Sequence, residues 1–266
     1  MESEREICRR LSGHSSSGAV GDGRFAPDNK GPRYTPDRHF ASAHIRLEID
    51  LNFSNKSFTG KATSTLKSLH DEAKEIVFDA VRLKIRTVEA QGKKIKFKHD
   101  GRKLTLSLPK AVSSGESVEI QISYSVSKPS LGLFFIDNPK QVWTQGQDEY
   151  ARYWFPCLDA PEEKATSEMI ATVPAGFRAV SNGHLVSRTR KGSKETFHYS
   201  MSTPFAPYLV TLTAGRFSEI KEYWQDVPVL YYCEKGREAD TKRAFGKTPD
   251  MLEFFSKKLG VPYPYE

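Results

Sequence analysis

The chain has 266 residues, three cysteines and a formal net charge of +7. This length suits one large all-β domain, or a domain and a half, whose core needs no disulfide staples. Cys8, Cys157 and Cys233 are odd in number and far apart, which argues against a disulfide framework while leaving room for one bridge. No apolar run reaches the length of a membrane helix, and the N-terminus lacks a signal-peptide core. We therefore expect a soluble, cytoplasmic protein with no membrane partner.

The positive charge raises the question of a nucleic-acid partner. The basic residues of the chain are scattered through KKIKFKHDGRK, RTRKGSK and KRAFGK, where they lie beside turn residues or on alternate strand positions. A basic β-sandwich that binds nucleic acid would interleave exposed aromatic residues with these charges, and only KFKHDGRK resembles that pattern. Solvated faces explain the charge better, so we expect no nucleic-acid partner.

Residues 1–38 are rich in Gly, Ser, Pro and charge and show no sustained periodicity. They predict a flexible leader or an irregular wrap over the domain surface.

Residues 39–236 show the period-two alternation of half-buried strands. In HIRLEIDL the residues Ile45, Leu47, Ile49 and Leu51 share one face, and SFTGKATSTL follows after a turn, so the two segments predict a hairpin. KLTLSL, ESVEIQISYSV, SEMIATVP, FRAVSN, ETFHYSMS, YLVTLTAG and VPVLYYC continue the pattern, with turn signals between them. The predicted fold is all-β, an antiparallel sandwich or saddle-like domain.

Residues 237–266 change to a helical pattern, which predicts a linking helix at the end of the chain. READTKRAF is compatible with a helix, and TPDMLEFFSKKLG predicts one with Thr248 as its cap, Pro249 in the first turn and Gly260 as its stop. The apolar face of this helix requires a packing partner and consists of Met251, Leu252, Phe254, Phe255 and Leu259.

Catalytic and metal-binding patterns are missing. A zinc hydrolase most economically uses two histidines one helical turn apart with a Glu between them, and none of the seven histidines are four residues apart. Cys157 follows Pro156 with no His near it in sequence, so a buried thiol is the better interpretation. No GxSxG, Walker loop or GxGxxG occurs. We predict no catalytic residue, metal ligand or cofactor in this chain.

The segment WTQGQDEYARYWFPCLDAPEEKATSEMIATVP resembles the hallmark segment of the amino-terminal domain of M1 family zinc aminopeptidases. The matching positions follow the family's order and are Thr144, Gln145, Gln147, Arg152, Phe155, Pro156, Cys157, Asp159, Pro161, Lys164 and Ala165. Further likeness lies in YTPDRHFASAHIRLEIDLNFSNKSFTGKATSTL, VSNGHL, MSTPFAPYLVTLTAGRF and KLGVPYPYE, so the resemblance covers about residues 34–266.

The resemblance implies a β-saddle domain and the first linking helix of a zinc aminopeptidase that removes N-terminal residues from peptides. The family's G-x-M-E-N and H-E-x-x-H motifs are not in this sequence. Zinc is therefore expected only in a catalytic domain, supplied in cis or in trans, and the chain alone is expected to be inactive. The alternative is a non-catalytic M1-like scaffold or protein-binding module, as in the general transcription machinery.

The resemblance also assigns a role to Gln147 and Gln145. In the family the residue matching Gln147 helps to hold the free amino terminus of the substrate, and the residue matching Gln145 lines the first subsite. The residues themselves are compatible with this role. Residues two positions apart on an extended segment point to the same side, and a side-chain amide oxygen can accept a hydrogen bond from an ammonium group. The competing interpretation is that both glutamines satisfy backbone groups of the loop.

For the rest of the segment we expect structural roles. Arg152 and Asp159 are expected to pair across the turn, and Pro156 and Pro161 to fix its backbone. The side chains of Tyr153, Trp154 and Phe155 are expected to pack beneath it. Lys164 is expected at the surface.

Overall fold

The computed structural model describes residues 38–265, and Arg38–Glu266 form one compact unit. The predicted leader therefore lies outside the described residues, apart from Arg38. Between Arg38 and Glu234 strands dominate, and the longest helix in that described range is a single 3₁₀ turn, which confirms the all-β prediction. The strands are β1 (Phe40–Asn52), β2 (Ser57–Ser68), β3 (Ala73–Asp79), β4 (Lys84–Ala90), β5 (Lys93–Lys94), β6 (Phe97–His99), β7 (Lys103–Val112), β8 (Ser117–Ser127), β9 (Leu133–Asp137), β10 (Lys140–Thr144), β11 (Ala165–Pro174), β12 (Arg178–Ser181), β13 (His184–Lys191), β14 (Lys194–Phe205), β15 (Leu212–Gly215), β16 (Phe217–Trp224) and β17 (Val227–Glu234).

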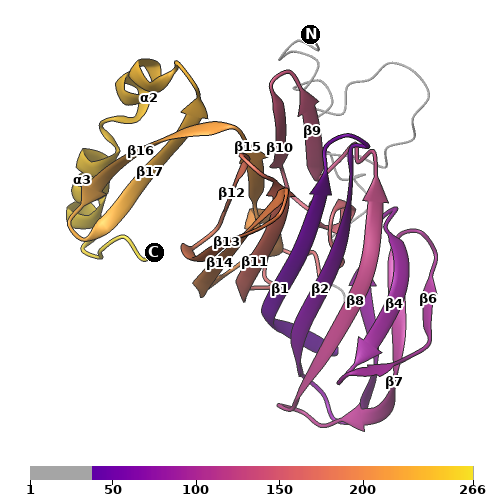
Figure 1. Cartoon of the computed structure of the whole chain (residues 1–266). Helices are drawn as coiled ribbons and strands as arrows, with labels where there is room; N and C mark the ends of the chain where they lie inside the picture. The colour runs from indigo at the N-terminus through magenta and orange to yellow at the C-terminus, as the bar shows by residue number, and fades with distance from the viewer. Residues whose placement is uncertain (1–37, 266) are drawn as a thin grey trace, which may run out of the picture. The chain divides into compact units, whose positions relative to one another are not determined.

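The largest sheet has eight strands in the order β13-β14-β11-β1-β2-β8-β4-β5. β1 and β2 pair as the predicted hairpin, with Leu47 opposite Ala62. Their alternation places one face in the core and leaves a polar face outside. β1 also pairs with β11, and this pair is parallel. The sheet is therefore mixed rather than fully antiparallel, because the chain returns to the free edge of β1 only after the long excursion through β3–β10 (Figure 1).

A three-stranded sheet, β3-β7-β6, forms the second layer of the core. Phe78, Leu104 and Leu106 from its inner face belong to the same continuous hydrophobic cluster as Leu47 and Ile122 of the large sheet. Two packed faces of this kind make a sandwich, as the alternating pattern predicted.

A four-stranded sheet, β12-β15-β10-β9, continues the fold, and β16 and β17 form a separate two-stranded sheet. Arg178 of β12 forms an ion pair with Glu219 of β16, and its guanidinium carbon lies 5.2 Å from the ring centre of Tyr232 in β17. Gln141 of β10 donates to the Glu234 carboxylate over 3.0 Å. Polar contacts thus connect the β16–β17 hairpin to the four-stranded sheet.

Two helices follow the hairpin, α2 (Glu238–Phe245) and α3 (Thr248–Leu259). α2 packs against β17 and α3 against β16, where Trp224 Nε1 donates to Glu253 over 2.8 Å. Gly260 ends α3 in the left-handed conformation, φ 72°, as predicted. The prediction of Thr248 as the N-cap is wrong, because Lys247 holds that position and the Thr248 hydroxyl donates backward to the Phe245 carbonyl.

Much of the apolar face of α3 is exposed. The exposed fractions are 53% for Met251, 60% for Phe254, 56% for Phe255 and 70% for Leu259. The β16–β17 hairpin therefore covers only part of the face for which the sequence predicted a partner. None of the helices among residues 38–265 has the length and hydropathy that a membrane crossing requires.

Candidate functional site

The segment between β10 and β11 carries the two predicted site glutamines. Gln145 N–H donates to the Gly132 carbonyl over 2.9 Å, and Tyr150 N–H donates to the Gly146 carbonyl over 2.7 Å. These bonds close a turn with Gln147, Asp148 and Glu149 at its exposed tip. The Gln147 side chain is thus presented to solvent, whereas Gln145 is half-buried at the base of the turn. Residues 145–150 are called the glutamine turn below.

Two glycines allow the backbone to approach this closely. A Cβ on Gly146 would lie 2.5 Å from the carbonyl oxygen of Tyr208, and a Cβ on Gly132 would lie 2.5 Å from that of Tyr150. Gly132 also has φ +74°, which disfavours other residues. The glutamine turn is therefore wedged between the start of β9 and the short 3₁₀ helix η2 (Pro207–Leu209).

Arg152, in the 3₁₀ turn η1 (Ala151–Tyr153), is the centre of a charged network behind the glutamine turn. Its guanidinium donates to Asp159 over 2.9 Å and to Glu149 over 2.7 Å, and lies 3.3 Å from Asp79. Lys103 donates to the same Asp79 oxygen over 2.6 Å. The predicted Arg152–Asp159 pair is confirmed, and the contacts to Asp79 and Glu149 extend it in both directions.

Burial and neighbouring charges together shift the pKa values of this network. Burial raises the pKa of Asp159 to about 6, although the bonds from Arg152 act in the opposite direction. Burial lowers the pKa of Arg152, but Asp159, Asp79 and Glu149 outweigh it and raise that pKa overall. Burial also raises the pKa of the Cys157 thiol well above its usual value, and the charges of Asp159 and Asp79 add to this effect. Cys157 is 1% exposed, so it is the buried thiol that the sequence predicted and not a reactive one.

The packing of the aromatic residues and the exposure of Lys164 can be checked, and the role of Pro156 and Pro161 stays a prediction. Trp154 and Phe155 are fully buried with their rings 4.6 Å apart, but Tyr153 is only half-buried and packs edge-on against Tyr150. Lys164 is exposed, as expected. The structure brings Gln145 and Gln147 to the same turn, and their substrate roles stay predictions.

Asp79 also belongs to the network around Arg152, although no sequence pattern indicated it. This residue ends β3, far upstream of the glutamine turn, and is 9% exposed. Its backbone exchanges two hydrogen bonds with Cys157, at 2.8 and 3.1 Å, which forms an isolated antiparallel bridge. A lone Asp at the end of a strand gives no signal of such a contact, because the pairing depends on the tertiary fold.

The described residues contain no metal centre. No group of three His, Cys, Asp or Glu side chains between Arg38 and Tyr265 is arranged to hold an ion. The donor set of this part of the chain therefore does not fit zinc.

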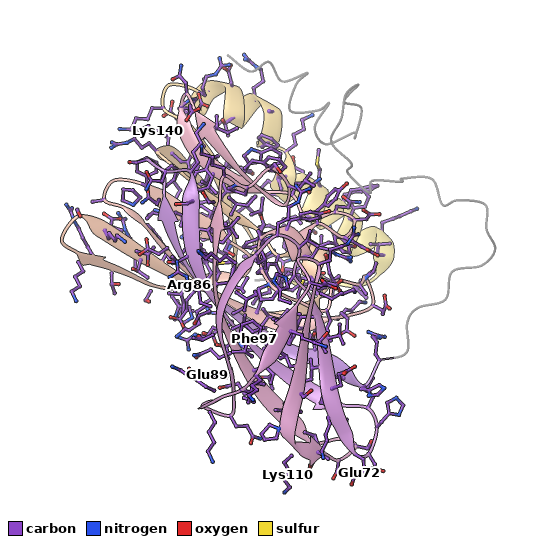
Figure 2. The ribbon with its side chains drawn as sticks, turned by 90° about the vertical axis from the view of Figure 1, so that its right-hand side faces the viewer. Glu72, Arg86, Glu89, Phe97, Lys110 and Lys140 are labelled. Atoms are coloured by element: carbon purple, nitrogen blue, oxygen red, sulfur yellow. The ribbon has the colours of Figure 1, made fainter. Side chains whose placement is uncertain are left out.

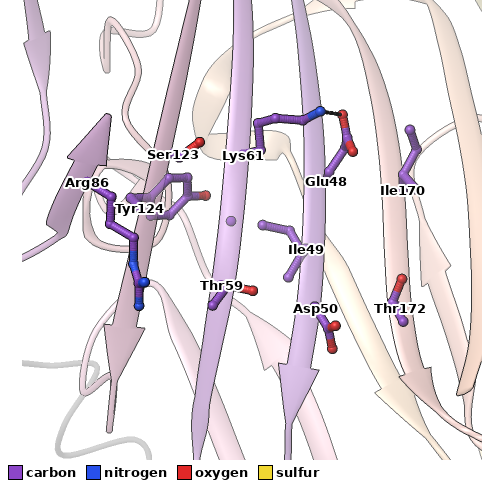
Figure 3. A pocket seen from close by; sticks show the side chains of 11 residues that line it. Glu48, Ile49, Asp50, Thr59, Lys61, Arg86, Ser123, Tyr124, Ile170 and Thr172 are labelled. Atoms are coloured by element: carbon purple, nitrogen blue, oxygen red, sulfur yellow. Dashed lines mark ion pairs between the residues drawn. The ribbon is translucent and has the colours of Figure 1, made fainter. Parts of the chain in front are cut away.

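A shallow hollow of about 380 Å³ opens on the polar face of the large sheet, away from the glutamine turn (Figure 3). Both of its carboxylates have a basic partner, since Glu48 pairs with Lys61 at 2.6 Å and Asp50 with Lys194, and Arg86 at its border donates to Ser125 over 3.4 Å. Tyr124 also borders it, but strand alternation and the close contact of its ring with Gly60 place the hydroxyl on the core side. The hollow therefore offers no feature that selects a ligand.

Basic side chains occur on more than one sheet of the described residues. Arg86 of β4, Lys110 of β7 and Lys140 of β10 stand well apart in Figure 2. The expectation of solvated charges stays a prediction.

Comparison with known proteins identifies the family. The profile of the Peptidase M1 N-terminal domain matches residues 38–209, which is most of the chain. The chain therefore belongs to the peptidase M1 N-terminal domain family, as the hallmark segment indicated.

Curated relatives include two archaeal aminopeptidases. The chain is 26% identical over 223 residues to "Probable aminopeptidase 1" of Sulfurisphaera tokodaii, covering 82% of this chain and 27% of the relative. It is 25% identical over 221 residues to the leucyl aminopeptidase of Saccharolobus solfataricus, covering 82% of this chain and 28% of that protein. The chain thus spans little more than a quarter of the length of these relatives.

Two further matches bear on function and fold. Transcription initiation factor TFIID subunit 2 of Gallus gallus is 29% identical over 174 residues, covering 61% of this chain and 15% of that protein. The crystal structure of an M1 zinc metallopeptidase from Deinococcus radiodurans matches with a TM-score of 0.74 at 20% identity, over 86% of this chain and 55% of that one. The latter likeness confirms the fold.

Proposed function

We propose that this chain is the substrate-rim domain of a zinc-dependent aminopeptidase, and that Gln147 accepts a hydrogen bond from the free amino terminus of the peptide. The observation that carries the proposal is the exposed glutamine turn within a domain of the M1 family. Its two archaeal relatives are named as aminopeptidases. The proposal leaves the chain inactive by itself.

The chemistry of Gln147 defines what it can contribute. A side-chain amide oxygen accepts from an ammonium N–H, but it carries no formal charge and attracts a cation less than a carboxylate does. Glu149 of the same turn is bound to Arg152 in η1, so its charge is largely compensated. An enzyme built on Gln147 would therefore draw most of its attraction for the ammonium group from carboxylates of another domain, and the chain alone should bind amines weakly. Gln145, at the base of the turn, is proposed to line the first subsite.

The partner domain is proposed to cover the exposed face of α3. Burial of a Phe or Leu side chain stabilises a complex by roughly 1.5–3 kcal/mol, and Phe254, Phe255 and Leu259 all lie on this face. A catalytic domain, in cis or in trans, would bury them and supply the zinc ligands that residues 38–265 lack. The cytoplasmic location stays a prediction.

The second candidate is a non-catalytic scaffold, which the match to the TFIID subunit favours. A scaffold would use the same α3 face for a protein partner but has no need for an amine acceptor at position 147. The two functions therefore differ in one property, the recognition of a free amino terminus at the glutamine turn.

A titration of the isotopically labelled chain with alanine amide distinguishes them, with N-acetylalanine amide as the control that lacks the ammonium group. We expect alanine amide alone to cause saturable NMR shift changes in residues 145–149, and Gln147→Ala to abolish them. Equal shifts with both ligands, or no shifts, would contradict the proposal.

A further inference from the structure

We infer that Asp79 is a positioning residue for the glutamine turn, an inference that rests on the proposed role of Gln147. Asp79 contacts three parts of the segment behind the turn. One carboxylate oxygen lies 3.3 Å from the Arg152 guanidinium, and the other accepts from Asp159 N–H over 3.3 Å. Its backbone bridges Cys157. Asp79 of β3 therefore contacts both the Arg152 side chain and the backbone of Cys157 and Asp159.

The connection to Gln147 continues through Arg152. The guanidinium that Asp79 faces also donates to Glu149, two residues after Gln147, over 2.7 Å. Glu149 lies inside the turn that the bond from Tyr150 N–H to the Gly146 carbonyl closes. A contiguous chain of polar contacts thus runs from Asp79 through Arg152 and Glu149 to the tip.

The backbone after Asp79 reinforces this connection. Val81 N–H donates to the Arg152 carbonyl over 2.9 Å, so β3 and its exit hold Arg152 from two sides. Asp79 is 9% exposed and the Arg152 side chain is 19% exposed, which limits the competition from water. Asp159 accepts from Arg152 Nε over 2.9 Å and, through its carbonyl, from Nη2 over 2.8 Å, so it anchors one side of the guanidinium. The charge of Asp79 is the second anchor, on the Nη1 side, and the two together fix where the guanidinium lies, and hence where Glu149 and the tip are held.

Lys103 provides a matched control, because it binds the same oxygen of Asp79 from the solvent side and does not touch the turn. Its side chain is 51% exposed. Loss of this partner leaves the Asp79–Arg152 contact in place. Lys103→Gln should therefore show whether loss of any ionic partner of Asp79 changes the turn, or only loss of the contact between Asp79 and Arg152.

The test repeats the alanine amide titration with Asp79→Asn and Lys103→Gln, and measures hydrogen exchange at Tyr150 N–H. We expect Asp79→Asn to weaken alanine amide binding by about tenfold, in line with the value of hydrogen bonds to charged groups. It should also speed exchange at Tyr150. Lys103→Gln should leave both unchanged, because Lys103 does not touch the turn and its loss leaves the contact between Asp79 and Arg152 in place.

Equal affinity and equal Tyr150 exchange in folded Asp79→Asn and the natural protein would overturn the inference. If the natural protein shows no amine-specific shift, the proposed function fails, and the exchange rate at Tyr150 still decides whether Asp79 holds the turn. Should Asp79→Asn not fold, Glu149→Gln breaks the exposed end of the same chain of contacts. Unchanged exchange at Tyr150 in that variant would equally overturn the inference.

Discussion

The backbone of Gly146 lies against the carbonyl oxygen of Tyr208, so closely that a Cβ at position 146 would come within 2.5 Å of it. Gly146→Ala must therefore displace the glutamine turn or η2. We expect a loss of about 1–3 kcal/mol in the free energy of unfolding, the usual cost of overpacking, measured by urea denaturation. NMR shifts should change in residues 145–149.

Gly192 supplies the control, since a Cβ there meets no atom within 4 Å. Gly192→Ala should lower the free energy of unfolding by about 1–2 kcal/mol, because position 192 has a left-handed backbone that strains other residues. It should leave the glutamine turn unchanged. Unaltered shifts in Gly146→Ala would show that the turn is not wedged as described.

Asp159 should give the protein a distinctive pH dependence. Its folded pKa of about 6 exceeds the ordinary 3.8, so the folded state binds this proton more tightly than the unfolded chain. The stability it contributes is therefore complete below 3.8 and is lost as the pH rises through about 6. At about 1.4 kcal/mol per pKa unit, the full change is on the order of 3 kcal/mol.

Urea denaturation of the natural protein and Asp159→Asn measures this dependence. The difference in unfolding free energy, natural minus variant, should fall as the pH rises across that interval. Asp100 is an opposite control, because backbone N–H groups of Lys103 and Arg102 lower its pKa. The corresponding difference for Asp100→Asn should rise with pH. A flat difference for Asp159→Asn would show that the carboxyl group is not held as described.

The exposed face of α3 should promote association of the isolated chain. Sedimentation should show a mass that grows with concentration, and the double variant Phe254→Ser/Leu259→Ser should suppress this growth because it removes exposed apolar surface. Leu69→Ser, which changes an isolated apolar residue that is 44% exposed, should have no such effect. A catalytic domain supplied in trans should also suppress association. A strictly monomeric chain whose α3 amides exchange as slowly as those of the sheets would contradict this prediction.

The chain alone should bind no stoichiometric zinc and should not hydrolyse amino-acid anilides. The reason is the donor set, because no His, Cys, Asp or Glu cluster in residues 38–265 can hold the ion. Metal analysis and an activity assay on the purified chain check this. One zinc per chain, with activity that persists through further purification, would prove it wrong.

The sequence predicted what local pattern controls. Alternation placed Leu47, Ile122 and Leu104 correctly in the core, and Gly260 marked the end of α3. The motif around Gln147 identified the candidate site because its residues lie within one segment of the sequence, Thr144–Ala165. Local signals also account for the pairing of Arg152 with Asp159, which lie close together in the chain.

Features that depend on distant contacts escaped prediction. The parallel pairing of β1 with β11 and the contact of Asp79 with Arg152 both join segments far apart in sequence. Thr248 resembled an N-cap in sequence, but its hydroxyl bonds to the preceding turn instead, because α2 ends only a few residues earlier. Propensity alone cannot rank such alternatives.

The most direct test of the proposed role of Gln147 is kinetic. A chimera would carry residues 38–235 in place of the N-terminal domain of the Deinococcus radiodurans M1 metallopeptidase, and Gln147→Ala and Asp148→Ala would be compared in a folded, zinc-loaded form. We expect Gln147→Ala to lower kcat/KM for an alanine anilide by about tenfold or more, the value of one hydrogen bond to a charged group, while the neighbouring variant has little effect. A Gln147→Ala chimera that retained the full kcat/KM of the unmodified chimera would contradict the proposed role of Gln147 in substrate binding.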